Sequence, residues 1–215
     1  MTPFTIEQNN YLTKNIQAFY HTDYIGYGKQ GNPDYLNTFK NTFNSYSNET
    51  IQLAKNQLLI HLEKDIFDIA YKHQELNIGW PLTISIIPRA KSQNSYHVNQ
   101  LQFYNTIKNC VTDAIKDLEQ TQNHTILADG CDYIIRHTDT RTTHLDKSGY
   151  GGTGLLPYPG ISKDTCHFSK EISGKDILLI DDIYTKTVNI DEDMIQALLD
   201  NGAKNVIFYS IGKTV

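Results

Sequence analysis

The sequence has few cysteines, and the three that occur form no recognisable cluster. Cys110, Cys131 and Cys166 lie far apart in a chain of 215 residues, and no CxxC pair is present. This spacing excludes a zinc ribbon and a disulfide framework, and it is typical of proteins in a reducing compartment. We therefore expect a protein of the cytoplasm.

The sequence also lacks a long hydrophobic run and an excess of positive charge. No apolar stretch of 18 residues occurs, and residues 1–15 contain no hydrophobic leader, so we expect no membrane association. The formal net charge is −5, which argues against general binding of nucleic acid, although a local basic groove stays open. With 39% hydrophobic residues, the chain can bury the core of one α/β domain.

Hydrophobic patterning predicts strands that alternate with helices. Apolar residues at three- and four-residue spacing predict helices over residues 51–74, 104–118 and 190–198. Short apolar and β-branched runs predict strands over residues 82–88, 131–137, 176–181 and 205–212. This order is typical of an α/β fold with a parallel sheet flanked by helices, in which ligands bind at the carboxyl ends of the strands.

Two adjacent aspartates, Asp181 and Asp182, stand at the end of the third predicted strand. Neighbouring residues on a strand point to opposite faces, so both can serve one ligand only where the backbone turns. The next segment, YTKTVN, leads into a helix, and the free amides of a helix N-terminus favour a phosphate. This pattern predicts a sugar-phosphate site, whereas the alternative is that the acids only stabilise a turn. Three further acids, Asp191, Glu192 and Asp193, are expected to complement the helix dipole.

The run ILLIDDIYTKTVNIDEDMIQALLDNGAKNVIFYSIGKT resembles the phosphoribosyl-pyrophosphate (PRPP) loop of type I phosphoribosyltransferases, most closely the competence-associated ComF-type branch. Weaker similarity at ISIIPRAKSQNSYHVNQ and IIRHTDTRTTHLDK extends it over about residues 80–215. The resemblance implies a transferase-like α/β domain over residues 79–215. Residues 1–78 would then form a helical, aromatic extension that could cover the site as a hood.

The resemblance also implies roles for individual residues. Asp181 and Asp182 would bind the ribose hydroxyls and Mg²⁺, and Arg89 and Lys91 would lie near the pyrophosphate. Residues 141–154 would close over the site. The residues implied to hold the 5′-phosphate are Thr185, Lys186, Thr187, Val188 and Asn189.

The implied function is transfer of a phosphoribosyl group from PRPP, or a related nucleotide, to an unidentified nitrogenous acceptor, with a homodimer as one option for assembly. Thr187 stands where the family pattern has glycine, a residue that lets main-chain amides approach a phosphate closely. This departure leaves two alternatives open. One is a non-catalytic regulator that binds PRPP or a nucleotide, and the other is a defence- or toxin-type effector.

Overall fold

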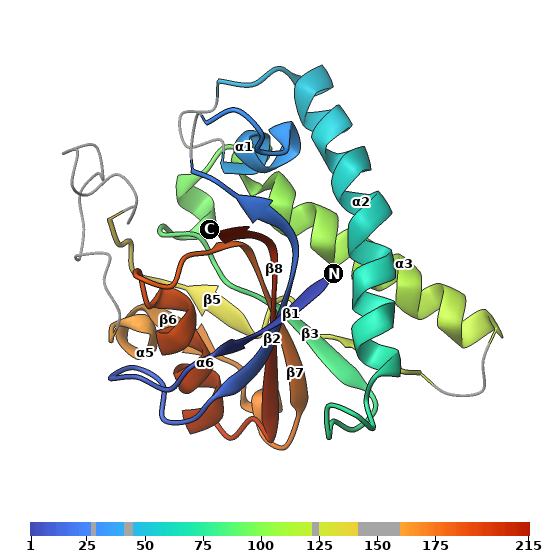
Figure 1. Cartoon of the computed structure of the whole chain (residues 1–215), viewed down its shortest axis with the longest axis vertical. Coiled ribbons are helices and arrows are strands. Elements are labelled where there is room, and N and C mark those ends of the chain that lie inside the picture. Colours follow the sequence, from blue (N-terminus) through green and yellow to red (C-terminus); the bar gives the residue numbers. More distant parts are fainter. Residues whose placement is uncertain (27–28, 41–44, 122–124, 142–159) are drawn as a thin grey trace.

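The computed structural model describes residues 1–26, 29–40, 45–121, 125–141 and 160–215. Its centre is a six-stranded sheet in the order β1-β2-β8-β7-β3-β4 (Figure 1). β1 runs antiparallel to β2, and the other neighbours in this sheet are parallel. The strands are β1 (Thr2–Ile6), β2 (Ile16–Tyr24), β3 (Leu82–Ile86), β4 (Leu127–Asp129), β7 (Asp176–Tyr184) and β8 (Asn205–Thr214). The predicted α/β class, a mostly parallel sheet flanked by helices, is confirmed.

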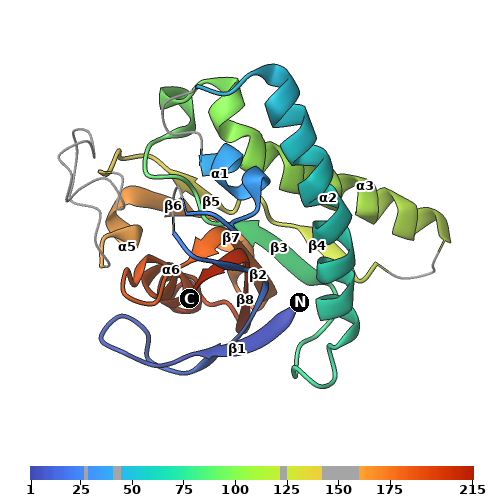
Figure 2. The same cartoon turned by 45° about the horizontal axis from the view of Figure 1, so that its top comes forward.

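Helices cover both faces of this sheet (Figure 2). α2 and α3 pack on one face, α6 packs on the other with α5 beside it, and α1 contacts β7. The helices are α1 (Asp34–Lys40), α2 (Asn48–Tyr71), α3 (Gln102–Thr121), α5 (Ser162–Thr165) and α6 (Ile190–Asp200). The described residues also contain three short 3₁₀ turns, η1 (Gln93–Ser95), η2 (Val98–Leu101) and η3 (Lys170–Ile172). The three helices predicted from hydrophobic spacing are confirmed within a few residues.

Strand β7 is apolar along its first half because both of its faces are buried. Leu178 and Ile180 belong to the cluster under α2 and α3, and Ile177 and Leu179 belong to the cluster under α6. A strand buried on two sides cannot alternate apolar and polar residues, and it reads instead as a continuous apolar run. This explains why apolar runs in the sequence predict β7 and β8.

The predicted N-terminal extension is helical only in part. α1 and α2 lie within residues 1–78, but β1 and β2 join the same sheet as the strands of the predicted transferase-like domain. β2 pairs in parallel with β8, from Ala18 opposite Phe208 to Tyr24 opposite Thr214. An unpaired β8 would present open main-chain N–H and C=O groups, and β2 satisfies them. The proposed boundary at residue 78 therefore divides one continuous sheet.

A strand lies within the predicted range 131–137, as β5 (Ile134–Arg136), but its expected place in the parallel sheet is wrong. The strand beside β3 is the shorter β4, whereas β5 pairs antiparallel with β6 (Cys166–Phe168) in a separate two-stranded sheet. β4 has only three residues, too few to show a hydrophobic period. The predicted closing segment, residues 141–154, lies outside the described residues apart from Arg141.

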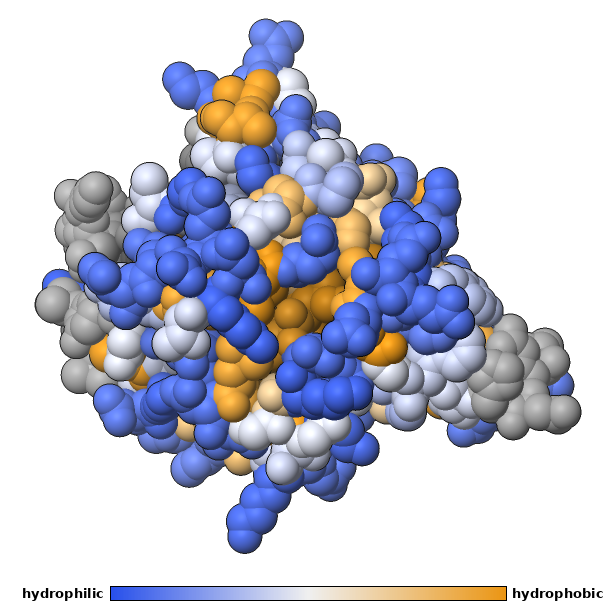
Figure 3. All heavy atoms as spheres, turned by 60° about the horizontal axis from the view of Figure 1, so that its bottom comes forward, coloured by the Kyte–Doolittle hydropathy of each residue, from blue (hydrophilic) through white to orange (hydrophobic). Residues whose placement is uncertain are grey.

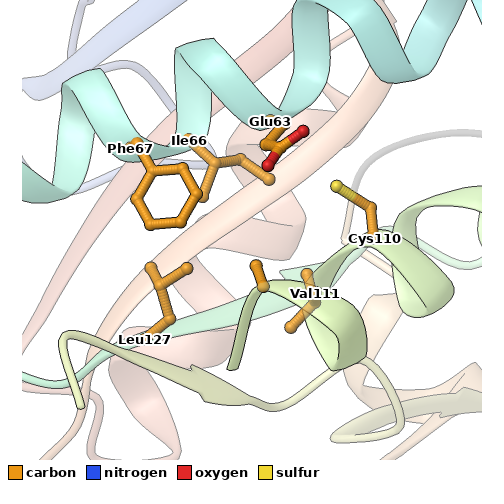
Figure 4. A pocket seen from close by; sticks show the side chains of 7 residues that line it. Glu63, Ile66, Phe67, Cys110, Val111 and Leu127 are labelled. Atoms are coloured by element: carbon orange, nitrogen blue, oxygen red, sulfur yellow. The ribbon is translucent and has the colours of Figure 1, made fainter. Parts of the chain in front are cut away.

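Between α2, α3 and the start of β4 lies a narrow hollow with no room for a water molecule (Figure 4). Glu63 is its one charged lining residue, and the apolar ones include Ile66, Phe67, Cys110, Val111 and Leu127. Because Leu127 is the first residue of β4, this hollow lies at the amino edge of the sheet, away from the predicted site. Burial raises the pKa of the Cys110 thiol to about 12.

One face of the molecule, seen in a space-filling view (Figure 3), is mostly hydrophilic. On the face brought forward from the bottom of Figure 1, hydrophobic residues show chiefly in a recess at the centre, which hydrophilic residues surround (Figure 3). Among the helices of the described residues, none combines the length and the apolar character that a membrane span requires.

Candidate functional site

Asp181 and Asp182 lie inside strand β7, near its carboxyl end. The prediction that the strand ends at the aspartates is wrong, because β7 continues to Tyr184 and pairs with β8 over this stretch. Asp181 stands opposite Ser210, and Ile183 stands opposite Gly212. Both aspartates are half-buried, and the main-chain N–H of Asp182 donates to the Asp181 carboxylate at 2.7 Å.

Asp181 belongs to a group of acids that we call the acidic cluster: Asp181, Asp182, Asp191 and Glu192. Asp191 and Glu192 come from the first turn of α6 and are only 5% and 1% exposed. The Asp191 carboxyl hydrogen-bonds with that of Asp181, and Glu192 accepts a hydrogen bond from the Tyr184 hydroxyl at 2.9 Å. The expectation that these helix residues complement the dipole is therefore incomplete, because two of them are also buried.

The acidic cluster has little compensating charge. The positive charge of Lys40 favours ionisation of Asp181, but it is the weakest of the named influences on that carboxyl. Across the part of the chain that the structure describes, no lysine or arginine forms an ion pair with Asp181, Asp182 or Asp191. The second oxygen of Asp191 and one of Glu192 are buried and have no hydrogen-bond partner among these residues.

This shortage changes the ionisation of the cluster. Burial and the charge of Asp182 raise the pKa of Asp181 to about 7. Burial and the charge of Asp181 raise the pKa of Asp191 well above its usual range. Burial also raises the pKa of Glu192. Carboxyls held away from their ordinary ionisation are typical of functional sites.

The segment after β7 forms a tight turn that leads into α6. The N–H of Val188 donates to the Thr185 carbonyl at 3.0 Å, and the hydroxyls of Thr185 and Thr214 share a hydrogen bond of 2.8 Å. Asn189 takes the left-handed conformation with φ of 58°, which asparagine tolerates better than most residues. Thr187 is exposed and does not have a positive φ, so this turn does not require the glycine of the family pattern.

The N-terminus of α6 carries no side-chain cap. Asn189 stands at the N-cap position, but its side chain accepts no amide of the helix and contacts Asn9 instead. Uncapped N–H groups at a helix N-terminus can bind an anion. Lys186 in the turn forms an exposed ion pair of 2.9 Å with Glu7.

Arg89 follows β3 at the same edge of the sheet, as expected, but its guanidinium contacts main-chain carbonyls. Nη1 donates to the carbonyls of Phe39 and Gln100 at 3.0 and 3.1 Å, and Nη2 donates to Lys40 at 2.8 Å. It therefore ties the end of α1 to the loop after β3. The main-chain N–H of Lys91 donates to the Tyr96 hydroxyl at 3.1 Å.

Arg136 is a cation that the sequence analysis did not single out. It is 9% exposed, its Nε donates to the Arg89 carbonyl at 2.7 Å, and its Nη1 donates to the Thr165 hydroxyl at 2.8 Å. No carboxylate of the described residues pairs with it. A buried guanidinium without an acid is a candidate anion ligand. The sequence feature that could have identified Arg136 is its place at the end of the predicted strand IIRH.

Helix α1 lies against the carboxyl ends of β7 and β8. A Cβ added at Gly212 would come within 3.1 Å of the Leu36 side chain and 3.2 Å of Ile183, so glycine permits this close packing. Tyr24 is buried, and its hydroxyl donates to Asn37 in α1 at 3.1 Å. A segment of residues 1–50 thus lies at the expected edge of the sheet.

Two comparisons with known proteins give no further guide to this arrangement. No protein-family model matches the chain, and no curated protein matches it. The resemblance to phosphoribosyltransferases therefore rests on the motif residues themselves.

Proposed function

We propose that this chain binds PRPP, or a related nucleotide, with Mg²⁺ and transfers its phosphoribosyl group to a nitrogenous acceptor. One observation carries the proposal. The half-buried carboxylates of Asp181 and Asp182 lie at the carboxyl edge of a parallel sheet, directly before a tight turn and an uncapped helix N-terminus. Carboxylates that accept hydrogen bonds from a diol, next to amides that bind a phosphate, suit a sugar phosphate.

The proposed roles follow from charge and position. Asp181 and Asp182 accept the ribose hydroxyls, and residues 185–189 with the first amides of α6 hold the 5′-phosphate. On the side of β3, Lys91 and Arg136 face the leaving group, and Arg89 acts mainly through the loop that it supports. The acceptor nitrogen bonds to C1 of the ribose while the bond from C1 to pyrophosphate breaks, and pyrophosphate leaves with the electron pair. Position and electrostatic stabilisation supply the catalysis.

The proposed cofactor, Mg²⁺, fits the donor set that the chain offers. It prefers oxygen ligands, keeps several waters and needs only one or two carboxylates when a substrate supplies phosphate oxygens. Asp181 and Asp182 are the candidate ligands, and the described residues contain no group of three ligating side chains that would form a full cage. If bound there, the ion would neutralise the negative charge that develops on the leaving pyrophosphate.

A second candidate function is a regulator that binds the same ligand without transferring it. Two observations favour it. Lys186 is paired with Glu7, and the guanidinium of Arg89 is bound to three carbonyls, so two of the predicted cationic ligands already have protein partners. A regulator needs binding, whereas a transferase also needs a neutralised leaving group.

Calorimetry with PRPP, with and without Mg²⁺, tests both functions. We expect Mg²⁺-dependent binding, followed by release of pyrophosphate when a panel of bases and amines is added. Binding without release for any acceptor would favour the regulator. Absence of binding to PRPP and to nucleotides would overturn both.

A further inference from the structure

The connection between β1 and β2, residues 7–15, runs alongside the turn after β7 and α6 (Figures 1 and 2). Lys186 pairs with Glu7 at 2.9 Å, and the Asn9 side chain donates to the Asn189 side chain at 3.0 Å. Further along, the N–H and the hydroxyl of Thr13 both donate to the Gln196 side chain at 2.9 Å. Residues 7–15 therefore contact both the turn and helix α6.

The orientation of the Asn9 amide is fixed by its own loop. Its Oδ1 accepts the main-chain N–H groups of Tyr11 at 2.8 Å and Leu12 at 3.2 Å. The main chains of Asn9 and Leu12 also hydrogen-bond to each other. Because the oxygen is used in this way, the NH₂ group of Asn9 is the end that donates to Asn189.

This contact in turn fixes the Asn189 amide. Its Oδ1 accepts from Asn9, so its own NH₂ group points elsewhere. Within the described residues, that NH₂ group makes no hydrogen bond and does not take part in capping α6. Asn189 therefore presents two donors, rather than an acceptor, beside the uncapped helix N-terminus.

We infer that Asn9 is a positioning residue for a phosphate monoester bound at this turn. It holds Asn189 so that N–H donors face the anion, and the opposite flip would present an oxygen lone pair to a negative charge. Glu7 belongs to the same arrangement, because it keeps Lys186 at the turn until the phosphate replaces it. The inference rests on the proposed function, since it assigns the 5′-phosphate of that ligand to residues 185–189.

Asn9→Asp is the sharpest test. Aspartate still accepts the N–H groups of Tyr11 and Leu12, so the loop is preserved, but it cannot donate to Asn189. Asn10→Asp is the matched control because it adds the same charge at the neighbouring exposed position. We expect Asn9→Asp to weaken ribose 5-phosphate and PRPP about tenfold, Asn10→Asp less than threefold, and both to leave inorganic pyrophosphate binding unchanged.

The outcomes separate this inference from the function on which it rests. If the wild-type protein binds neither ribose 5-phosphate nor PRPP, the proposed function fails. If it binds both and Asn9→Asp binds them equally well, only the role of Asn9 is wrong. Equal losses in the Asn9 and Asn10 variants would assign the effect to charge and would also overturn it. Glu7→Gln should strengthen ribose 5-phosphate binding by up to about threefold, and a loss would contradict the exchange at Lys186.

Discussion

Two buried carboxyl groups in this molecule have opposite surroundings. Asp65 of α2 accepts hydrogen bonds of 2.8 Å from the His21 ring and from the hydroxyl of the fully buried Tyr209. Burial opposes its ionisation, but these bonds outweigh burial and lower the pKa of Asp65. Asp191 of α6 faces the carboxyl of Asp181 instead, and its pKa is raised. The partners of Asp65 stabilise its ionised form, whereas the neighbouring carboxyl destabilises the ionised form of Asp191.

This difference in hydrogen-bond partners and pKa indicates which of the two acids stabilises the fold. A buried carboxylate whose hydrogen bonds are satisfied connects elements, here β2, α2 and β8. A buried carboxyl pair without an ion-pair partner costs stability, and such a cost persists chiefly at sites where a ligand or metal supplies the missing charge. The comparison therefore supports the acidic cluster, rather than the Asp65 network, as the functional site.

The largest expected effect on stability comes from removing the hydrogen-bonded carboxylate of Asp65. Asp65→Ala leaves the Tyr209 hydroxyl and the His21 ring without their acceptor, and we expect the free energy of unfolding to fall by about 3 kcal/mol. Urea denaturation at pH 7 measures this loss. Asp68→Ala, at an exposed position of the same helix, should cost less than about 0.5 kcal/mol. Equal costs for the two variants would show that Asp65 is not a structural link.

The pH dependence of the Asp65 contribution has a definite sign. Because the pKa of Asp65 is lowered in the folded protein, its stabilisation is present above the unfolded value of about 3.9. It is lost as the pH falls through the folded value. The difference in stability between wild type and Asp65→Ala should therefore shrink below about pH 4.

A second test asks whether Arg89 serves the fold or the acidic cluster. Arg89→Gln removes donors to three carbonyls that join α1 to the loop after β3, so we expect a loss of about 2 kcal/mol in unfolding free energy. Pyrophosphate binding in the folded variant should change less than threefold. Arg136→Gln, measured in parallel, should weaken pyrophosphate about tenfold. If Arg89→Gln weakened pyrophosphate binding and Arg136→Gln did not, Arg89 would be the direct pyrophosphate ligand.

The sequence predicted the centre of this fold because apolar runs report burial directly. β7 and β8 are apolar on both faces, and α2, α3 and α6 keep regular helical spacing. β2 was missed because its outer half, HTDY, is polar, and its pairing with β8 joins residues almost 200 positions apart. β4 was missed because three residues show no period.

The candidate site was predictable at the level of Asp181 and Asp182 and not beyond it. Motif position identified the two acids, but burial of Asp191 against Asp181 depends on how α6 packs on the strand. The contacts of Glu7 and Asn9 with the turn join opposite ends of the chain, and no local pattern encodes them. Whether a charged side chain is free or paired is a tertiary property, which is also why the carbonyl contacts of Arg89 were unexpected.

The role of the acidic cluster is tested by neutralising the two acids that strand β7 contributes, Asp181 and Asp182. Asp181→Asn with Asp182→Asn should weaken Mg²⁺-dependent PRPP binding at least tenfold, because the diol and the metal lose their charged acceptors. The unfolding free energy should stay equal or rise, since like charges have been removed. Asp113→Asn on α3 is the control. Unchanged affinity in the double variant, measured by calorimetry, would show that the acids do not contact the ligand.

Asp191→Asn tests how the acidic cluster makes the stability of the protein depend on pH. A carboxyl whose folded pKa is raised contributes most below its unfolded pKa, and that contribution is lost as the pH rises through the folded value. The wild-type protein should therefore lose stability between pH 5 and pH 8. Asparagine keeps a donor for Asp181 without ionising, so the variant should be more stable than wild type by about 1 kcal/mol at pH 8. Urea denaturation at the two pH values checks this, and an equal decline in both proteins would contradict it.

The smallest effect is expected at Thr187. Because the left-handed position of the turn is Asn189, and Thr187 does not have a positive φ, glycine at residue 187 relieves no strain. Thr187→Gly should keep ribose 5-phosphate binding within about threefold and cost about 0.5 kcal/mol of stability through a more flexible unfolded chain. Calorimetry decides between three readings. A large loss of affinity would make the threonine hydroxyl a ligand, and a large gain would mean that its side chain blocks the approach of the phosphate. A small change would mean that the turn reaches its shape through Asn189, so the departure from the family pattern would not count against phosphate binding.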